Sequence, residues 1–125
     1  MSDTLLASFF MPKNKTYFVY LNYFATGEGM IDAFGFFYAK NPTDAKRQLI
    51  VTTMCSTKDT PESIDACVGY FGLGAETYNC SNKKDREKAK IILASFLTQT
   101  IINAIFATIG RGMLKQSFHL HRNLS

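Results

Sequence analysis

The chain has 125 residues, of which 46% are hydrophobic, 14% are aromatic and only 19% are charged. This composition excludes a disordered chain, and the length is enough for a single domain, residues 1–125, with its own core. The net charge of +4 is placed unevenly: residues 1–80 carry six basic and eight acidic side chains, whereas residues 81–125 carry eight basic and two acidic ones. The basic part is therefore the one that phosphate, lipid head groups or an acidic partner would meet.

The N-terminal segment, residues 1–15, has an acidic residue where a secretory signal would be positively charged, and its apolar stretch is short. We therefore expect a short helix over Ser2–Phe10 and no secretory signal. The cysteines, Cys55, Cys67 and Cys80, are odd in number and lack CxxC spacing. This pattern favours reduced thiols in a cytoplasmic chain, with membrane association as the alternative location.

A β-hairpin is predicted over residues 16–40. Thr16–Ala25 is rich in aromatic and β-branched residues, and Met30–Lys40 is rich in aromatic ones, so both segments are predicted to be strands. The turn at residues 26–29 contains two glycines, which is typical of a tight connection between antiparallel strands.

Both faces of this hairpin are largely apolar, whereas a strand that meets water on one face alternates apolar and polar residues. A lone hairpin is only marginally stable, and its free edges invite another strand. One chain offers too few further elements to cover both faces. We therefore expect self-association into a homo-oligomer, edge to edge or face to face. The residues predicted for that interface are Tyr20, Phe24, Phe34, Phe36, Gln99 and Asn103.

Two helices are predicted after the hairpin, over residues 42–54 and 61–71. Asn41 can cap the first of them, and Pro42 suits the first helical position. The same start signal recurs before the second helix at Thr60, Pro61 and Glu62. Two glycines then end the second helix.

The last predicted helix, residues 83–114, contains the most apolar stretch of the chain. Residues 91–110 carry no charge, and a helix of that length is long enough to cross a bilayer. Gln99 and Asn103 oppose a lipid environment, because burying an amide without a hydrogen-bond partner is unfavourable. We therefore expect a long, very apolar helix buried in protein, with a membrane span as the alternative. Residues 115–125 are predicted to be a C-terminal tail.

The densest basic cluster lies at the start of this last helix, and two interpretations stay open. One is a solvated helix end, and the other is a surface for phosphate or nucleic acid, with tyrosine rings stacking on bases. The solvated helix end is the preferred interpretation, although cations at a helix N-terminus oppose the helix dipole, which adds some weight to the second. The candidate anion contacts are Lys83, Lys84, Arg86, Lys88 and Lys90.

The sequence contains few residues that could form a catalytic, metal-binding or cofactor-binding motif. The cysteines with His119 and His121 are potential zinc ligands, but their spacing matches no zinc pattern. Gly72 and Gly74 resemble half of a dinucleotide-binding loop, but they follow a predicted helix and not a strand. We therefore predict no catalytic residue, no metal ligand and no cofactor.

These features favour an α+β fold, with an antiparallel β-hairpin followed by three helices. The function that they favour is a non-catalytic protein-interaction module, such as an inhibitor, immunity or adaptor protein that covers a partner's surface. The alternatives are a nucleic-acid-binding protein that uses residues 83–90 and a small membrane protein that spans at residues 91–110. The expected partners are a second copy of the chain and another protein.

Overall fold

The computed structural model describes residues 13–112 and the backbone of residues 118–124. The helix predicted over Ser2–Phe10 lies outside these residues. The elements in chain order are β1 (Lys15–Ala25), β2 (Gly29–Ala39), α2 (Pro42–Met54), α3 (Pro61–Gly72), β3 (Glu76–Asn79), α4 (Lys83–Leu93), α5 (Gln99–Gly110) and β4 (Phe118–Leu124).

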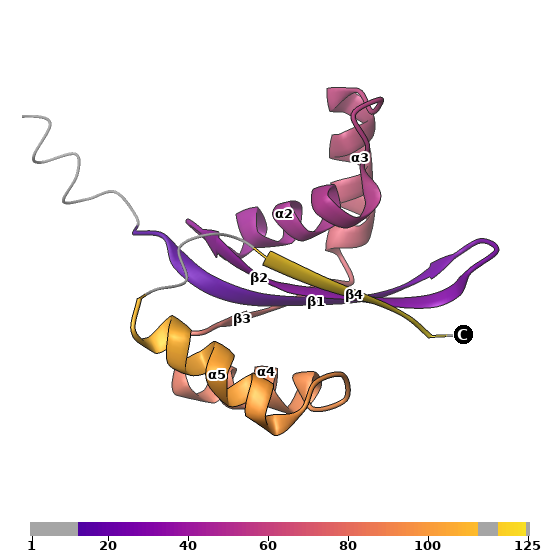
Figure 1. Ribbon diagram of the computed structural model, residues 1–125. Coiled ribbons are helices and arrows are strands. Elements are labelled where there is room, and N and C mark those ends of the chain that lie inside the picture. The colour runs from indigo at the N-terminus through magenta and orange to yellow at the C-terminus, as the bar shows by residue number, and fades with distance from the viewer. Residues whose placement is uncertain (1–12, 113–117, 125) are drawn as a thin grey trace, which may run out of the picture.

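The described strands form an antiparallel sheet in the order β3-β1-β2-β4, which lies at the centre of the fold (Figure 1). β1 and β2 pair along their full length, with Tyr20 opposite Phe34, so the predicted hairpin is confirmed. Gly27 and Gly29 in the connection have φ values of 87° and 81°. Side chains make that conformation unfavourable, so glycine is required at this turn.

The α+β class is confirmed, but the sheet is wider than predicted. β3 has only four residues, too few for an alternating pattern to be visible. β4 falls in the segment predicted to be a C-terminal tail, residues 115–125, and that prediction is wrong for Phe118–Leu124. Both added strands bond to backbone groups that the hairpin would otherwise leave open, which stabilises it.

Helices cover both faces of the sheet (Figure 1). On one face, α2 and α3 enclose a core that includes Val19, Phe37 and Leu49. The expectation that the second face needs another copy of the chain is wrong, because α4 and α5 enclose a second core there. The buried residues of this second core include Phe18, Phe34, Phe36, Leu93, Ile102 and Phe106.

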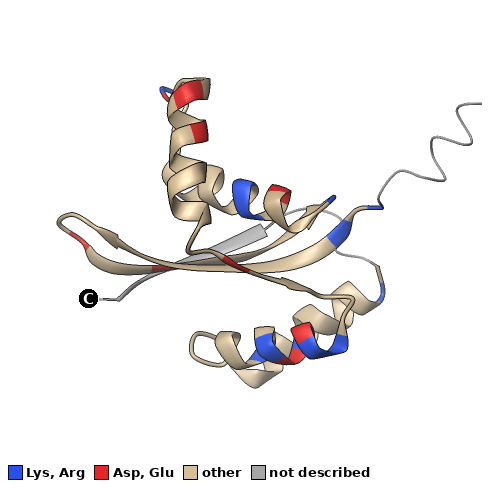
Figure 2. Cartoon of the chain, turned by 180° about the vertical axis from the view of Figure 1, so that it is seen from behind, with Lys and Arg blue, Asp and Glu red and all other residues tan. Residues whose placement is uncertain are grey.

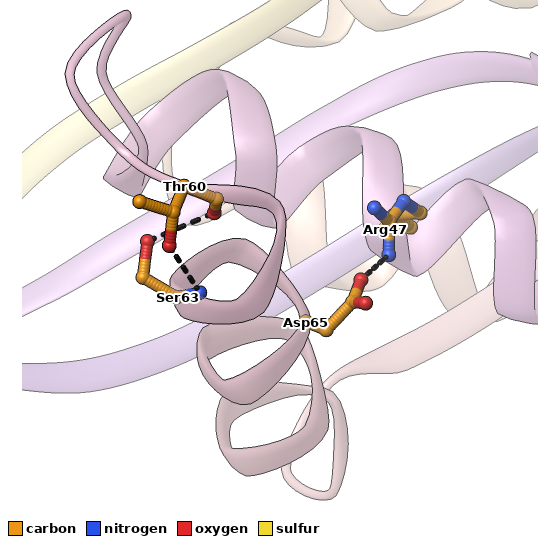
Figure 3. Close-up of polar contacts among 4 residues, drawn as sticks. All are labelled: Arg47, Thr60, Ser63 and Asp65. Atoms are coloured by element: carbon orange, nitrogen blue, oxygen red, sulfur yellow. Dashed lines mark hydrogen bonds and ion pairs between the residues drawn. The ribbon is translucent and has the colours of Figure 1, made fainter.

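The first two helices begin where the sequence predicts. Asn41 Oδ1 accepts a hydrogen bond from the N–H of Asp44 at 2.8 Å, and Pro42 is the first residue of α2. Thr60 Oγ1 accepts a hydrogen bond from the N–H of Ser63 at 3.1 Å in the same way (Figure 3). These caps satisfy backbone donors that the first helical turn leaves open.

Helix α3 rests on α2 and stands away from the sheet (Figure 1). Arg47 and Asp65 form an exposed ion pair of 2.9 Å between the two helices (Figure 3). Lys46 Nζ also donates to the carbonyl oxygen of Gly72 at 3.4 Å. Every residue of α3 is at least partly exposed. Because an exposed ion pair contributes only about 0.2–1 kcal/mol, the packing of partly buried side chains such as Val68 and Phe71 on the core is also needed to hold α3.

The single long, very apolar helix predicted over residues 83–114 is wrong. α4 ends at Leu93 and α5 begins at Gln99. The connection between them packs Phe96 against Phe34, with ring centroids 4.7 Å apart. This break lets two short helices each turn an apolar stripe toward the same face of the sheet. Among the described residues, no helix has the length and apolar character needed to cross a membrane.

Candidate functional site

The outer edge of β1 is only partly paired, because β3 pairs with Tyr17–Tyr20 and goes no further. The N–H of Cys80 donates to the carbonyl oxygen of Thr16 at 3.0 Å. Alternate residues of a strand direct their backbone groups to the same side, so the even-numbered residues of β1 face β3. Asn22 and Phe24 therefore present N–H and C=O groups outward, and none of the described residues pairs with these groups. This end of β1 is an open sheet edge.

A hollow of about 410 Å³, open to solvent, lies between this edge and the C-terminal end of α3. β1 supplies one wall, and the end of α3 with the following turn supplies the other. The lining residues are Leu21, Asn22, Tyr23, Phe24, Tyr70, Phe71 and Gly74. We call these seven residues, together with the neighbouring Leu73, the open-edge surface.

Large apolar side chains of the open-edge surface face solvent. Phe24 is 66% exposed, Tyr70 is 74% exposed and Leu73 is 89% exposed. Phe24 and its cross-strand partner Met30 lie near the tip of the hairpin, and this tip extends beyond the helices of both layers (Figures 1 and 2). Exposed apolar groups beside a hollow are typical of a surface that binds another molecule.

Aromatic contacts fix the end of α3 against β1. The rings of Tyr23 and Phe71 meet edge to face, with centroids 5.6 Å apart. Tyr70 packs on Phe71 in the same manner at 5.0 Å. Such pairs contribute about 0.5–1.5 kcal/mol beyond the burial of their surface. Gly74 adds no side chain to this wall, and a Cβ there would lie 3.8 Å from Leu21 Cδ1.

The surroundings of the open-edge surface are acidic. Burial, and then the charge of Glu28, raise the pKa of Tyr23, so a carboxylate lies near the hairpin end of the open edge. Glu76 begins β3 at the other end, where pairing stops. Residues 16–39 and 61–79, which supply almost all of β1 and the whole of β2, α3 and β3, contain five acidic and no basic residues, whereas Lys46 of α2 reaches the end of α3 at Gly72. Carboxylates therefore flank the open edge at both ends.

A buried carboxylate joins the two central strands where the open edge begins. Asp32 Oδ1 accepts hydrogen bonds from the hydroxyl of the half-buried Tyr20 at 2.5 Å and from Asn22 Nδ2 at 2.9 Å. Burial, and then the bond to Asp32, raise the pKa of Tyr20. Asp32 Oδ2 is buried without a hydrogen-bond partner among the described residues, and the sheet register places Arg122 of β4 opposite Asp32. These bonds hold Asn22 in place, so its backbone groups face outward from a fixed position.

The basic residues predicted to contact anions all lie on α4, but they do not form one free surface (Figure 2). Arg86 donates to the carbonyl oxygen of Cys80 at 3.0 Å. Lys90 Nζ lies 3.6 Å from a carboxylate oxygen of Glu87 and 5.3 Å from the ring centroid of Phe106. Arg86 and Lys90 therefore stabilise the fold. The other members of the cluster, which are exposed, are Lys83, Lys84 and Lys88.

The residues predicted for a homo-oligomer interface are not brought together on one exposed surface. Phe34 and Phe36 are buried against α4 and α5 of the same chain. Gln99 Nε2 donates to Asn103 Oδ1 at 2.9 Å on the exposed side of α5. Phe24 lies on the open-edge surface. Self-association stays a prediction, but the uncovered face that motivated it does not exist.

The sequence-based prediction misses Tyr70 and Leu73. Both lie at or just after the end of the predicted helix 61–71, where large apolar residues are normally assigned to the core. The available signal is the pair of glycines at positions 72 and 74, which end the helix beside these residues. A helix that stops there leaves its last apolar side chains without a following turn to cover them.

Of the potential zinc ligands, the structure describes the three cysteines, whereas the side chains of His119 and His121 lie outside the described residues. Within the described part of the chain, no group of three or more His, Cys, Asp or Glu side chains is placed to hold a metal ion. Burial raises the pKa of the Cys80 thiol to about 12. Burial, and then the neighbouring Cys55, raise the pKa of Cys67. A raised pKa lowers the fraction of thiolate, the form that binds metals and attacks electrophiles.

We expect the stability to fall between about pH 9 and 12. Burial raises the pKa of Cys80 from 9.0 to about 12, and burial with the hydrogen bond to Glu76 raises the pKa of Tyr78 from 10.0 to about 12. Each contribution to stability is complete below the ordinary pKa and is lost as the pH rises through the folded-state pKa. The midpoint of urea unfolding measures this decline. Cys80→Ala and Tyr78→Phe should each make the decline smaller, and a midpoint that stays constant over this pH range would contradict the assignment.

The described residues thus form an α+β fold in which an antiparallel sheet carries two helices on each face and leaves part of one edge open. No protein family model matches the chain, and no curated protein or solved structure matches it either.

Proposed function

We propose that the protein is a non-catalytic protein-interaction module that covers part of a partner's surface with its open-edge surface. The exposure of Phe24, Tyr70 and Leu73 around one hollow is the observation that carries this proposal. Burying apolar surface releases water and stabilises a complex by about 25 cal/mol per Å². An inhibitor, an immunity protein or an adaptor acts in this way, by occupying a surface and without changing a bond.

A nucleic-acid-binding function through α4 is the second candidate. The exposure of Lys83, Lys84 and Lys88 on one helix favours it (Figure 2). Glu87 lies among these lysines, and Lys90 pairs with it, which reduces the positive charge that a phosphate would meet. The open-edge surface combines a hollow, apolar side chains and free backbone groups, so it supports protein binding more strongly.

A photo-crosslinking residue in place of Leu73 is expected to give one discrete adduct with a partner protein in the native cells. The reason is that Leu73 is almost fully exposed and adjoins the hollow. Gel mobility and mass spectrometry of the purified adduct measure this outcome.

Ile91 is the matched control, because it is 73% exposed but lies on α4, in the opposite helical layer. The same crosslinker at position 91 should not give that adduct. Identical adducts from both positions, or no discrete adduct from position 73, would contradict the proposed function.

A further inference from the structure

We propose that the partner contributes an extended peptide segment, which adds to the sheet as a further strand beside residues 21–25. This inference rests on the proposed function and names the class of partner for the same surface. The segment carries apolar side chains at alternate positions and Lys or Arg at its ends. In strand addition, backbone hydrogen bonds supply affinity, and alternate side chains supply specificity.

Asn22 and Phe24 supply the backbone groups for this strand. Their N–H and C=O groups point away from β2, and β3 stops at the pair formed by Tyr20 and Glu76. A strand rises about 3.3 Å per residue, so five residues of open edge extend over roughly 16 Å. A partner segment of about five residues fills this length, end to end with β3, and forms about four backbone hydrogen bonds.

The side chains of the added strand meet different surroundings on the two faces of the sheet. A residue opposite Tyr23 points to the face of α3 and enters the hollow beside Tyr70 and Phe71. A residue opposite Phe24 points to the other face and packs on an exposed ring. The hollow therefore selects apolar side chains at every second position of the peptide.

The charges around the edge select a peptide with basic ends. Glu28 lies in the hairpin loop beyond one end of the open edge, and Glu76 lies at the other end, and both are exposed. Lys46 bonds to the carbonyl oxygen of Gly72 at the end of α3, and Glu76 accepts a hydrogen bond from the Tyr78 hydroxyl. Neither bond removes a charge, so two carboxylates stand against one ammonium. Basic residues on the peptide would complement the two carboxylates and raise the rate of association.

A second copy of the chain is a less suitable occupant. A symmetric pairing that uses both open residues sets Asn22 of one copy opposite Phe24 of the other. The hairpin loop then falls opposite Tyr20 of the other copy, where β3 is already paired. Glu28 of one copy would approach Glu76 of the other, and like charges facing each other across strands are destabilising.

Proline at position 24 tests the backbone hydrogen bond directly. The N–H of Phe24 points away from β2, so Phe24→Pro leaves the hairpin's own hydrogen bonds intact and removes the outward donor. Phe24→Ala removes the same ring but keeps the N–H, so it is the matched control. Tyr23→Pro removes a donor that the hairpin itself uses, so it is the reference for a variant in which the hairpin is disrupted.

The probe is a synthetic peptide of about seven residues, with Lys at both ends and valine and threonine alternating between them. It is titrated into isotope-labelled protein and followed by NMR. We expect the amide signals of Asn22 and Phe24 to shift and to gain protection from hydrogen exchange. Phe24→Pro should bind the peptide roughly tenfold more weakly than Phe24→Ala, the effect of about one hydrogen bond. A peptide with Glu at both ends should bind more weakly than the one with Lys.

Strand addition is overturned by equal affinities of Phe24→Pro and Phe24→Ala, or by unchanged amide signals at millimolar peptide. Shifts at Asn22 that depend on protein concentration without peptide, together with a dimer in light scattering, would instead identify the occupant as a second copy. The crosslink at Leu73 separates the two proposals. An adduct whose yield is the same in Phe24→Pro as in Phe24→Ala keeps the interaction function and rejects strand addition, whereas no adduct in the otherwise unchanged protein rejects the interaction function itself.

Discussion

Replacing Phe36 with lysine is expected to unfold the protein. Phe36 is 0% exposed, and its ring lies 5.2 Å from that of Phe18 and 5.6 Å from that of Phe106, measured between centroids. Loss of such a ring costs about 3–5 kcal/mol, and an unpaired buried ammonium adds several more. A domain of this size has a total stability of only about 5–15 kcal/mol. Circular dichroism and thermal unfolding measure the outcome.

Phe24→Lys is the control for this substitution, because Phe24 belongs to the same sheet face but is exposed at the hairpin tip. It should keep the melting temperature within a few degrees. A folded but smaller Phe36→Lys species would contradict the prediction, since it would place Phe36 between copies of the chain.

Leu49→Ala and Leu93→Ala are each expected to lower the free energy of unfolding by about 2–5 kcal/mol. Both leucines are fully buried, Leu49 between α2 and one face of the sheet and Leu93 between α4 and the other. Each substitution leaves a cavity that the surrounding helices fill only in part. Urea unfolding measures both changes.

The sheet separates these two sites, so the double variant should lose the sum of the two effects to within about 0.5 kcal/mol. Ile91→Ala is the control, because Ile91 belongs to α4 but faces solvent, and its effect should stay below about 0.5 kcal/mol. An unchanged stability of Leu93→Ala would show that α4 does not pack on the sheet, and the second core would then be wrong.

The elements that could be predicted from the sequence are those set by local signals. Asn41 with Pro42, and Thr60 with Pro61, define two helix starts within a few residues, and the caps occur as expected. The glycine-containing turn defines the hairpin in the same way. None of these features depends on what the rest of the chain does.

The break between α4 and α5 could not be predicted, because the sequence there contains no residue that usually ends a helix. Residues 94–98 contain neither glycine nor proline, and the uncharged run continues through them. Thr98 caps α5, but a threonine inside a helix is common enough to carry little weight. The packing of Phe96 on Phe34 determines the break, and that contact joins residues far apart in sequence.

β4 and the open-edge surface also depend on contacts between residues that are far apart in the sequence, so local patterns do not predict them. Phe118, Leu120 and Leu124 alternate with polar residues, but Arg122 interrupts the apolar series, and the segment resembles a tail. Phe24 is among the residues that the sequence predicts for an interface, there with a second copy of the chain. The open edge exists because β3 stops at Glu76, and this end of β3 is visible only in the pairing of the strands.

Helix α3 is the wall of the hollow that is least firmly tied to the molecule. An exposed ion pair, one bond from Lys46 and partly buried side chains such as Phe71 hold it in place. Separating it from α2 breaks only these contacts, so a local opening requires far less free energy than unfolding the sheet. The fraction of molecules with α3 docked then limits the apparent affinity for any ligand of the hollow. A substitution that stabilises α3 would tighten binding from a distance, without touching the partner.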